Sequence, residues 1–389
     1  MSLDLRYPAL SDLKAACRRR IPRFVWEYLD SATGTEAVTR RNRAALDAVC
    51  LRPGVLCGTQ EPRLDTRLLG QDYAMPVGVA PLGMSGLIWP GAEGLLARMA
   101  ADQRLPYCLS TVATRLPEEI GPLAGEMGWF QLYPPRDPEI RRDLLRRARA
   151  SGFRVLVLTV DVPAPSRRER QLRAELTFPP KVTPRMLAQV ALCPAWALGT
   201  LRLGQPRLRL MEGYAATTGP ASSTGHAGYM LRTHPDWDYL AAVRAEWPGP
   251  VVVKGVLDPA TARRVRAAGA DAVWVSNHGG RQFDGAPATA EVLPAIRAAV
   301  GPGYPLIFDG GVEGGLDILR ALALGADFAM LGRGWHHALG ALGPEGPAHL
   351  AAILRADLVA NLHQLGLSRP ADAAARLWRP DAPGTGAPG

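Results

Sequence analysis

The chain has 389 residues, of which 47% are hydrophobic, and a formal net charge of +9. This length is long for one domain but suits an α/β barrel with insertions, and the apolar fraction supports a sizeable core. The positive charge is almost entirely arginine spread among acidic neighbours, which indicates compositional bias, so we expect no nucleic-acid partner.

Cysteine usage and hydropathy bear on where the protein resides. The five cysteines are scattered and lack metal-type pairing, which suits a reducing cytosol. Residues 1–8 lack the apolar core of a signal peptide, and no apolar stretch is long enough to span a bilayer. We therefore expect a cytoplasmic protein and no metal site.

The N-terminal part of the chain is expected to be helical. Apolar residues recur at helical spacing between residues 9 and 50, interrupted by Pro22. Tyr28 lies in this segment, where it could be ordinary core. The segment predicts helices that precede the main fold.

From Pro76 onward, short apolar runs alternate with amphipathic helical stretches. The expected strands are 77–80, 107–110, 129–132, 155–160, 251–254, 272–276, 306–309 and 328–331. Eight alternating units favour a (β/α)8 barrel over an open doubly wound sheet. The long interval after the fourth strand predicts an insertion at about 165–235. We expect a single barrel domain over 1–378 and a disordered tail at 379–389.

Polar or small residues end each of these strands. They are Pro81 and Gly83, Ser110, Gln131 and Tyr133, Thr159 and Asp161, Lys254, Ser276 to Arg281, Asp309 to Gly311, and Gly332 with Arg333. Enzymes with this fold build their active site at that rim, and glycine-rich loops after the last two strands are typical of a phosphate site. Neither loop has the G-x-G-x-x-G pattern of a nicotinamide site.

The stretch 273–285 carries the strongest chemical signal. An apolar run ends in Ser276-Asn277-His278-Gly279-Gly280-Arg281. A histidine can take a proton near neutral pH, and an arginine can hold a carboxylate by paired hydrogen bonds. The alternative is an ordinary polar loop. Lys254, a lysine in a chain that otherwise uses arginine, suggests a compact charge at a strand end, although it could simply reach to the barrel rim.

These motifs resemble one family. The residues 276–282 with Asp284, together with 253–255, 309–311, 130–133 and 158–161, resemble the FMN-dependent α-hydroxy acid oxidases and dehydrogenases over about 8–368. The resemblance implies a (β/α)8 barrel that binds FMN and oxidises a 2-hydroxy acid to the 2-oxo acid. It also implies functional side chains: the base His278 with its partner Asp161, the tyrosines Tyr28 and Tyr133, and the carboxylate-binding arginines Arg168 and Arg281.

The resemblance further implies a set of FMN contacts. They are Ala80, Pro81, Leu82 and Gly83 through the backbone, then Ser110, Gln131, Thr159, Lys254, Ser276, Asp309, Gly310, Gly311, Gly332 and Arg333. Lys254 is expected to stabilise the negative charge of reduced FMN.

Two positions depart from the family pattern. Val112 stands where glycolate oxidase has a tryptophan over the substrate, which favours a bulky or aromatic, mandelate-like acid. Glu313 stands where the family has a phosphate-binding arginine, which bears on the affinity for FMN. The alternatives to a hydroxy acid enzyme are an FMN barrel with another reaction, such as a flavin isomerase, and a flavin-binding protein without turnover.

Partners beyond the substrate stay open. The electron acceptor could be oxygen, a quinone or a protein. The mostly apolar stretch within 182–203 resembles the membrane-touching insertion of quinone-linked members, although it could instead be a lid over the site. The first of these alternatives predicts peripheral contact at the inner face of the membrane. The resemblance also implies a homo-oligomer, namely a tetramer.

Overall fold

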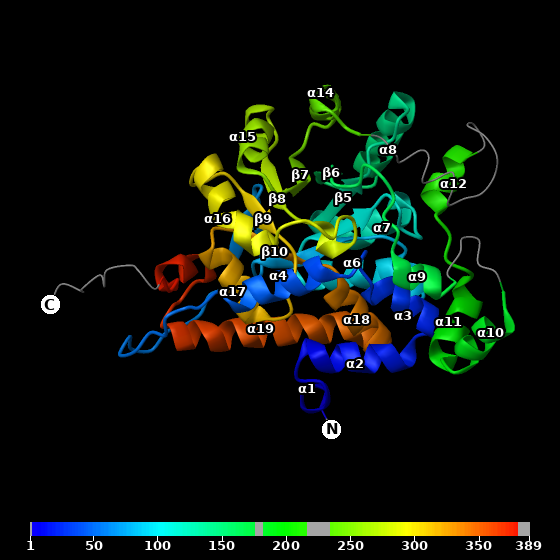
Figure 1. Cartoon of the computed structure of the whole chain (residues 1–389), viewed down its shortest axis with the longest axis horizontal. Coiled ribbons are helices and arrows are strands. Elements are labelled where there is room, and N and C mark those ends of the chain that lie inside the picture. Colours follow the sequence, from blue (N-terminus) through cyan, green and yellow to red (C-terminus); the bar gives the residue numbers. More distant parts are fainter. Residues whose placement is uncertain (1, 176–181, 216–233, 380–389) are drawn as a thin grey trace.

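The computed structural model describes residues 2–175, 182–215 and 234–379. Apart from Arg379, the predicted tail lies outside these described residues. Figure 1 shows the chain with its central barrel and the surrounding helices.

Eight parallel strands form a closed barrel in the order β10-β3-β4-β5-β6-β7-β8-β9. The strands are β3 (Val77–Leu82), β4 (Tyr107–Ser110), β5 (Gly128–Leu132), β6 (Val155–Thr159), β7 (Val251–Val256), β8 (Ala272–Val275), β9 (Leu306–Phe308) and β10 (Phe328–Leu331). All eight predicted strands are present, so the predicted barrel is confirmed. Their nearly continuous burial explains why each strand is an apolar run without alternation.

A small hairpin that the sequence did not predict packs against the barrel interior. Strands β1 (Thr66–Leu68) and β2 (Gln71–Tyr73) pair antiparallel ahead of β3. The Tyr73 ring packs edge-on against Trp129 and Phe328, and its hydroxyl accepts a hydrogen bond from Trp129 Nε1 at 3.1 Å. These residues belong to the cluster of large side chains that fills the barrel. The barrel is therefore a packed core, and its open rim is left for the functional residues.

Helices surround the barrel and precede it. They are α1 (Leu3–Arg6), α2 (Leu10–Arg20), α3 (Arg23–Asp30), α4 (Ala37–Asp47), α5 (Ser85–Ile88), α6 (Ala92–Gln103), α7 (Pro117–Ala124), α8 (Pro138–Ala150), α9 (Glu169–Arg173), α10 (Pro184–Ala191), α11 (Pro194–Leu203), α12 (Arg209–Ala215), α14 (Trp237–Glu246), α15 (Pro259–Ala267), α16 (Thr289–Val300), α17 (Gly315–Ala323), α18 (Arg333–Leu342) and α19 (Gly346–Leu365).

The N-terminal helices pack onto the last helices of the barrel. In Figure 1, α2 lies alongside α18, and α19 lies next to α18. A Cβ atom at Gly340 would stand 2.3 Å from Cys17 Sγ, so α18 can approach α2 this closely only with a glycine there. This packing holds α3, which follows α2, at the rim of the barrel.

The predicted insertion separates β6 from β7 and includes α9 to α12. Helices α10 and α11 meet at a bend of 106° and stand at one edge of the molecule (Figure 1). Gln189 Oε1 accepts a hydrogen bond from Phe24 N at 3.1 Å, and Trp196 Nε1 donates to Leu87 O at 3.0 Å. Among the described residues no single helix is long and apolar enough to cross a membrane, although the bent pair α10–α11 passes that test by length and composition alone.

Candidate active site

A cavity of about 370 Å³ lies at the C-terminal rim of the barrel. The predicted residues that line it are Tyr28, Ala80, Pro81, Leu82, Gly83, Val112, Tyr133, Thr159, Arg168, Lys254, His278, Arg281, Asp309, Gly310, Gly311, Gly332 and Arg333. The four remaining predicted residues form hydrogen bonds with each other or with lining residues. Ser110 is hydrogen-bonded to Gln131, Asp161 to His278, and Ser276 to Lys254. The structure therefore gathers every predicted site residue around one cavity.

His278 stands between a carboxylate and a phenol. Its Nδ1 lies 3.0 Å from Asp161 Oδ1, and its Nε2 lies 3.3 Å from the Tyr133 hydroxyl. The His278 backbone has a left-handed φ of 56°, which is uncommon for a residue other than glycine. The His278 backbone N–H donates a hydrogen bond to the Ser276 hydroxyl at 3.0 Å, which helps to hold this turn. Asp161 is thus placed to orient the imidazole ring from the Nδ1 side.

Burial decides the protonation of this group. It lowers the pKa of His278 below its usual value, and the charge of Lys254 acts the same way, while Asp161 opposes both. Burial alone would raise the pKa of Asp161, but the charges of His278 and Lys254 outweigh it and leave that pKa lowered. At neutral pH the His278 imidazole is therefore neutral and lies beside the ionised Asp161 carboxylate. Burial and the Asp161 charge raise the pKa of Tyr133, so its phenol keeps its proton.

A second buried network joins three strand ends. Lys254 Nζ donates to Ser276 Oγ at 2.8 Å and lies 3.4 Å from Asp309 Oδ2. The Ser276 hydroxyl also lies 2.8 Å from Asp309 Oδ1, to which it can donate. Because the lysine is paired and buried, its charge has a fixed position at the rim.

Two arginines stand on the same side of the cavity as Tyr28. Arg281 Nη1 donates to the carbonyls of Tyr28 at 3.0 Å and Ser31 at 2.8 Å, and its guanidinium lies 5.3 Å from the Tyr28 ring centre. Burial and the nearby Arg168 charge lower the pKa of Arg281 to about 9, so it remains protonated at neutral pH. Arg168 Nη2 donates to Gln282 Oε1 at 3.3 Å. Neither arginine forms an ion pair within the part of the chain that the structure describes, so the two half-buried cations are suited to an anionic ligand.

Two unsatisfied polar atoms indicate a polar cofactor at the rim. Within the described residues, Gln131 Nε2 and Thr159 Oγ1 are buried and have no hydrogen-bond partner. Such groups are costly unless a ligand or water completes them. Gly83 leaves this part of the wall without a side chain, because a Cβ atom there would lie 2.8 Å from Val112 Cγ2, which is too close for contact. The amide, the hydroxyl and the end of β3 that lines the cavity fit the polar edge and flat face of a flavin.

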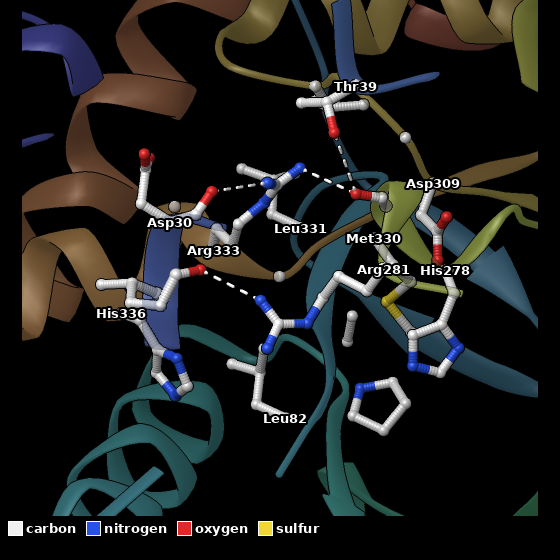
Figure 2. A pocket seen from close by; sticks show the side chains of 18 of the residues that line it. Asp30, Thr39, Leu82, His278, Arg281, Asp309, Met330, Leu331, Arg333 and His336 are labelled. Carbon is white, nitrogen blue, oxygen red and sulfur yellow. Dashed lines mark hydrogen bonds between the residues drawn. The ribbon is translucent and has the colours of Figure 1, made fainter. Parts of the chain in front are cut away.

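The candidate phosphate site is formed by glycines and an arginine that also line the cavity. Gly310 and Gly311 have φ values of 110° and 87°, which favour glycine, and α18 begins at Arg333. In Figure 2 the Arg333 guanidinium donates two hydrogen bonds, which reach Asp30 O at 3.3 Å and Gly279 O at 3.1 Å. Glu313 lines the cavity with an exposed side chain. The backbone and one arginine can therefore hold an anion here, with a carboxylate at the entrance.

The cavity has further lining residues that the sequence did not single out. They include Lys14, Asp30, Glu36, Thr39, His336 and His337. The first four come from the N-terminal helices and their connections, where nothing in the local sequence indicates contact with the barrel rim. The His336-His337 pair directly follows the predicted phosphate loop and was the one available signal.

The family of the chain follows from comparison with known proteins. A family model described as FMN-dependent dehydrogenase matches residues 17–380. The chain belongs to the FMN-dependent dehydrogenase family. FMN is therefore its cofactor, and the chain is an FMN-dependent dehydrogenase of a 2-hydroxy acid.

Two curated members of the family are closely similar in sequence over almost their whole length. The L-lactate dehydrogenase of Pseudomonas syringae pv. syringae (strain B728a) is 38% identical over 352 residues, which are 90% of this chain and 92% of that protein. The L-lactate dehydrogenase of Xanthomonas euvesicatoria pv. vesicatoria (strain 85-10) is 40% identical over 352 residues and 90% of each chain.

Solved structures in the family have the same fold. A monotopic membrane protein, (S)-mandelate dehydrogenase, superposes with a TM-score of 0.89 at 32% identity, covering 95% of this chain and 98% of that one. A mandelate oxidase superposes with a TM-score of 0.80 at 33% identity, covering 94% and 97%. These similarities agree with the fold and cofactor that the motifs predict, and they leave the choice among hydroxy acids open.

Proposed function

We propose that this protein oxidises an L-2-hydroxy acid with a bulky or aromatic side chain to the 2-oxo acid, with His278 as the base. The observation that carries the proposal is the hydrogen bond between His278 and Asp161 in the cavity that Arg168 and Arg281 also line. A base and two cations around one space match the two ends of a 2-hydroxy acid. The hydroxyl-bearing carbon faces the base, and the carboxylate faces the arginines.

Each side chain then has a defined task. Arg168 and Arg281 hold the carboxylate and so orient the α-carbon. Neutral His278 accepts a proton from the substrate through Nε2, and ionised Asp161 stabilises the imidazolium that forms. The Tyr133 phenol, 3.3 Å from Nε2, donates a hydrogen bond to the substrate oxygen. When bound, FMN would supply the acceptor for the two electrons.

The flavin would rest on residues already described. Its polar edge would pair with Gln131, Thr159 and Lys254, and its phosphate would bind at the Gly310–Gly311 turn and Arg333. Lys254 is held in place by Ser276 and Asp309, so its charge is available to stabilise the reduced, anionic form.

Val112 supports the preference for a larger acid. Its side chain lines the cavity and takes up less space there than an aromatic residue would. The named relatives divide between lactate and mandelate, and the small residue favours the mandelate side of that division.

Anaerobic flavin bleaching tests the function directly. Holoprotein is mixed with lactate, glycolate, mandelate and other 2-hydroxy acids without oxygen, and the loss of flavin absorbance is followed. Reduction by at least one acid, fastest with the bulky ones, is expected. A protein whose flavin no acid of a broad panel reduces lacks the proposed function and is better described as one of the two alternatives above.

We also propose that the protein docks on an anionic bilayer through α10 and α11. Five leucines on or beside these helices are strongly exposed: Leu187, Leu192, Leu198, Leu201 and Leu203, with exposed fractions from 49% to 81%. Clustered apolar exposure of this kind marks an interaction surface. Arg185 and Arg202 flank it and suit anionic headgroups. One similar structure is called a monotopic membrane protein, which also supports the proposal.

A further inference from the structure

Arg170 occupies the centre of an ion-pair cluster beside the cavity, which its partners Asp30 and Glu36 also line. Its Nε lies 2.6 Å from Glu27 Oε2, and its Nη1 lies 3.2 Å from Asp30 Oδ2 and 3.3 Å from Glu36 Oε2. All four side chains are largely buried, with exposed fractions of 16% to 26%. One guanidinium therefore bridges three carboxylates that would otherwise repel each other.

The carboxylates belong to the segments that carry the substrate-facing groups. Glu27 and Asp30 lie on α3 on either side of Tyr28, and Glu36 precedes α4. The Tyr28 hydroxyl donates to Gly83 O at 3.3 Å, which fixes the phenol at the cavity wall. Glu36 Oε1 also accepts from Ala32 N at 3.0 Å, so it shapes the connection after α3.

Arg170 itself belongs to the segment that carries Arg168. Arg168 is the residue before α9 and has a left-handed φ of 47°. A helix of five residues cannot hold its position alone, so its place depends on contacts with other elements. Glu169 Oε2 accepts from Gly34 N at 2.9 Å, and Gln171 Nε2 donates to Ser31 Oγ at 3.2 Å. These two hydrogen bonds and the Arg170 ion pairs together hold α9 against α3 and the loop that follows it.

We infer that Arg170 is a positioning residue that locks α9 onto α3 and so sets the spacing between Arg168 and Tyr28 for the substrate carboxylate. This inference rests on the proposed function, because it assigns Arg170 to the carboxylate end of that site. Arg170 stands outside the set of cavity-lining residues, so it acts through Arg168 and Tyr28. Without it, α9 loses its ion pairs to α3 and to the start of α4, while Asp30 keeps its ion pair with Lys14 at 3.0 Å.

The test measures carboxylate binding apart from turnover. Phenylacetate has a carboxylate but no hydroxyl to oxidise, and its binding to oxidised holoprotein is followed by the change in the flavin absorption spectrum. Arg170→Met should weaken this binding by about tenfold or more, because small misplacements of binding groups are expensive. The KM for the best acid should rise by a similar factor, with a smaller fall in kcat. FMN affinity should stay near that of the parent.

Two further variants separate positioning from general destabilisation. Arg170→Lys keeps the charge and should recover part of the lost affinity. Arg173→Met removes an exposed arginine from the same helix and should bind phenylacetate like the parent. If Arg170→Met does not fold, Arg170→Lys alone must still show weaker phenylacetate binding with parental FMN affinity.

The outcomes distinguish this inference from the proposed function. Parental phenylacetate affinity in Arg170→Met overturns the inference and leaves the function standing. Equal losses of phenylacetate and FMN affinity also overturn it, because they indicate a structural role only. A parent protein that neither binds phenylacetate nor is reduced by any 2-hydroxy acid rejects the proposed function, and the inference with it.

Discussion

Burial sets the chemistry of His278 at the scale of the single residue. Its pKa is lowered mainly because the charged ring would be taken out of water, and the Asp161 carboxylate offsets only part of that effect. A base has to be neutral to accept a proton, so the lowered pKa keeps it ready across neutral pH. The acid limit of activity should therefore lie below pH 6.5, the ordinary histidine value.

His278→Ala tests the base. FMN should stay bound, since the flavin contacts lie on other residues, while the rate of flavin reduction falls by a factor of about 10² to 10⁴. Anaerobic stopped-flow absorbance measures the rate, and the parent rate should decline only as pH falls below 6.5. Reduction of the variant at the parental rate removes His278 from the mechanism.

Val112→Trp tests substrate size. A tryptophan would fill space beside Gly83 and Tyr28, so large acids should lose activity relative to small ones. One methylene of contact is worth about 1 to 3 kcal/mol, which predicts a graded change in relative kcat/KM across an aliphatic and aromatic series. Val112→Leu serves as the milder comparison. A parent enzyme that works best on glycolate contradicts the size argument.

Glu313→Arg tests the phosphate end. The FMN phosphate carries close to two negative charges, and two unit charges about 4 Å apart repel or attract by roughly 1 kcal/mol in water and about 4 kcal/mol in a partly screened site. Glu313 is exposed at the cavity entrance, so we expect tighter FMN binding in Glu313→Arg and a severe loss in Arg333→Ala. Fluorescence titration of apoprotein measures both. Unchanged affinity in Glu313→Arg means that this side chain does not face the phosphate.

At the scale of the element, α10 and α11 are anchored to the active-site wall while their leucines face outward. Phe24 and Trp196 pack edge-on with ring centres 6.0 Å apart, and Gln189 caps the N–H of Phe24. Tyr28 lies on the same helix α3, about one turn after Phe24. The α10–α11 pair therefore packs against α3 through Gln189 and Trp196 and exposes its leucines to solvent.

Replacing the outward leucines tests the proposed docking. The variant with serine at Leu187, Leu192, Leu198 and Leu201 should lose sedimentation with vesicles of phosphatidylglycerol and phosphatidylcholine, because the buried apolar area is the main source of binding. A matched control carries serine at Val55 and Leu56, which are also strongly exposed but lie elsewhere on the chain. Parental protein that fails to sediment with the vesicles rejects the membrane proposal, and equal losses in both variants reject its location.

At the scale of the whole molecule, buried histidines link stability to pH. His336 and His337 lie on α18, and burial lowers the pKa of each to about 3. The unfolded chain takes up these protons near pH 6.5, while the folded chain does so only near pH 3. The unfolded state therefore binds more protons between these values, and stability is lost as pH falls below 6.5.

The size of this effect can be measured. From pH 6.5 to pH 5, each buried histidine should remove about 2 kcal/mol from the free energy of unfolding, from about 1.4 kcal/mol per pH unit. Chemical denaturation of the parent at both pH values gives the loss, and His336→Gln and His337→Gln variants should each show a smaller one. A pH dependence that is the same in all three proteins contradicts the assignment to these histidines.

The barrel could be predicted because its signals are local. Each strand is a short apolar run buried on both faces, and each run is followed by a helix, so the count of units is readable along the chain. The β1–β2 hairpin was not predicted because two strands of three residues are too short to show a hydrophobic pattern. Its position depends on the packing of Tyr73 against Trp129.

By itself, the sequence determined the cofactor family and indicated the candidate catalytic stretch, since Ser276 to Arg281 are contiguous and their chemistry can be read in one stretch. The tertiary structure alone decided how the partners meet. Asp161 lies 117 positions from His278, and Glu27 lies 143 positions from Arg170. Such contacts depend on the packing of α3 and the insertion against the barrel rim, and no local pattern of residues encodes a distance across that rim.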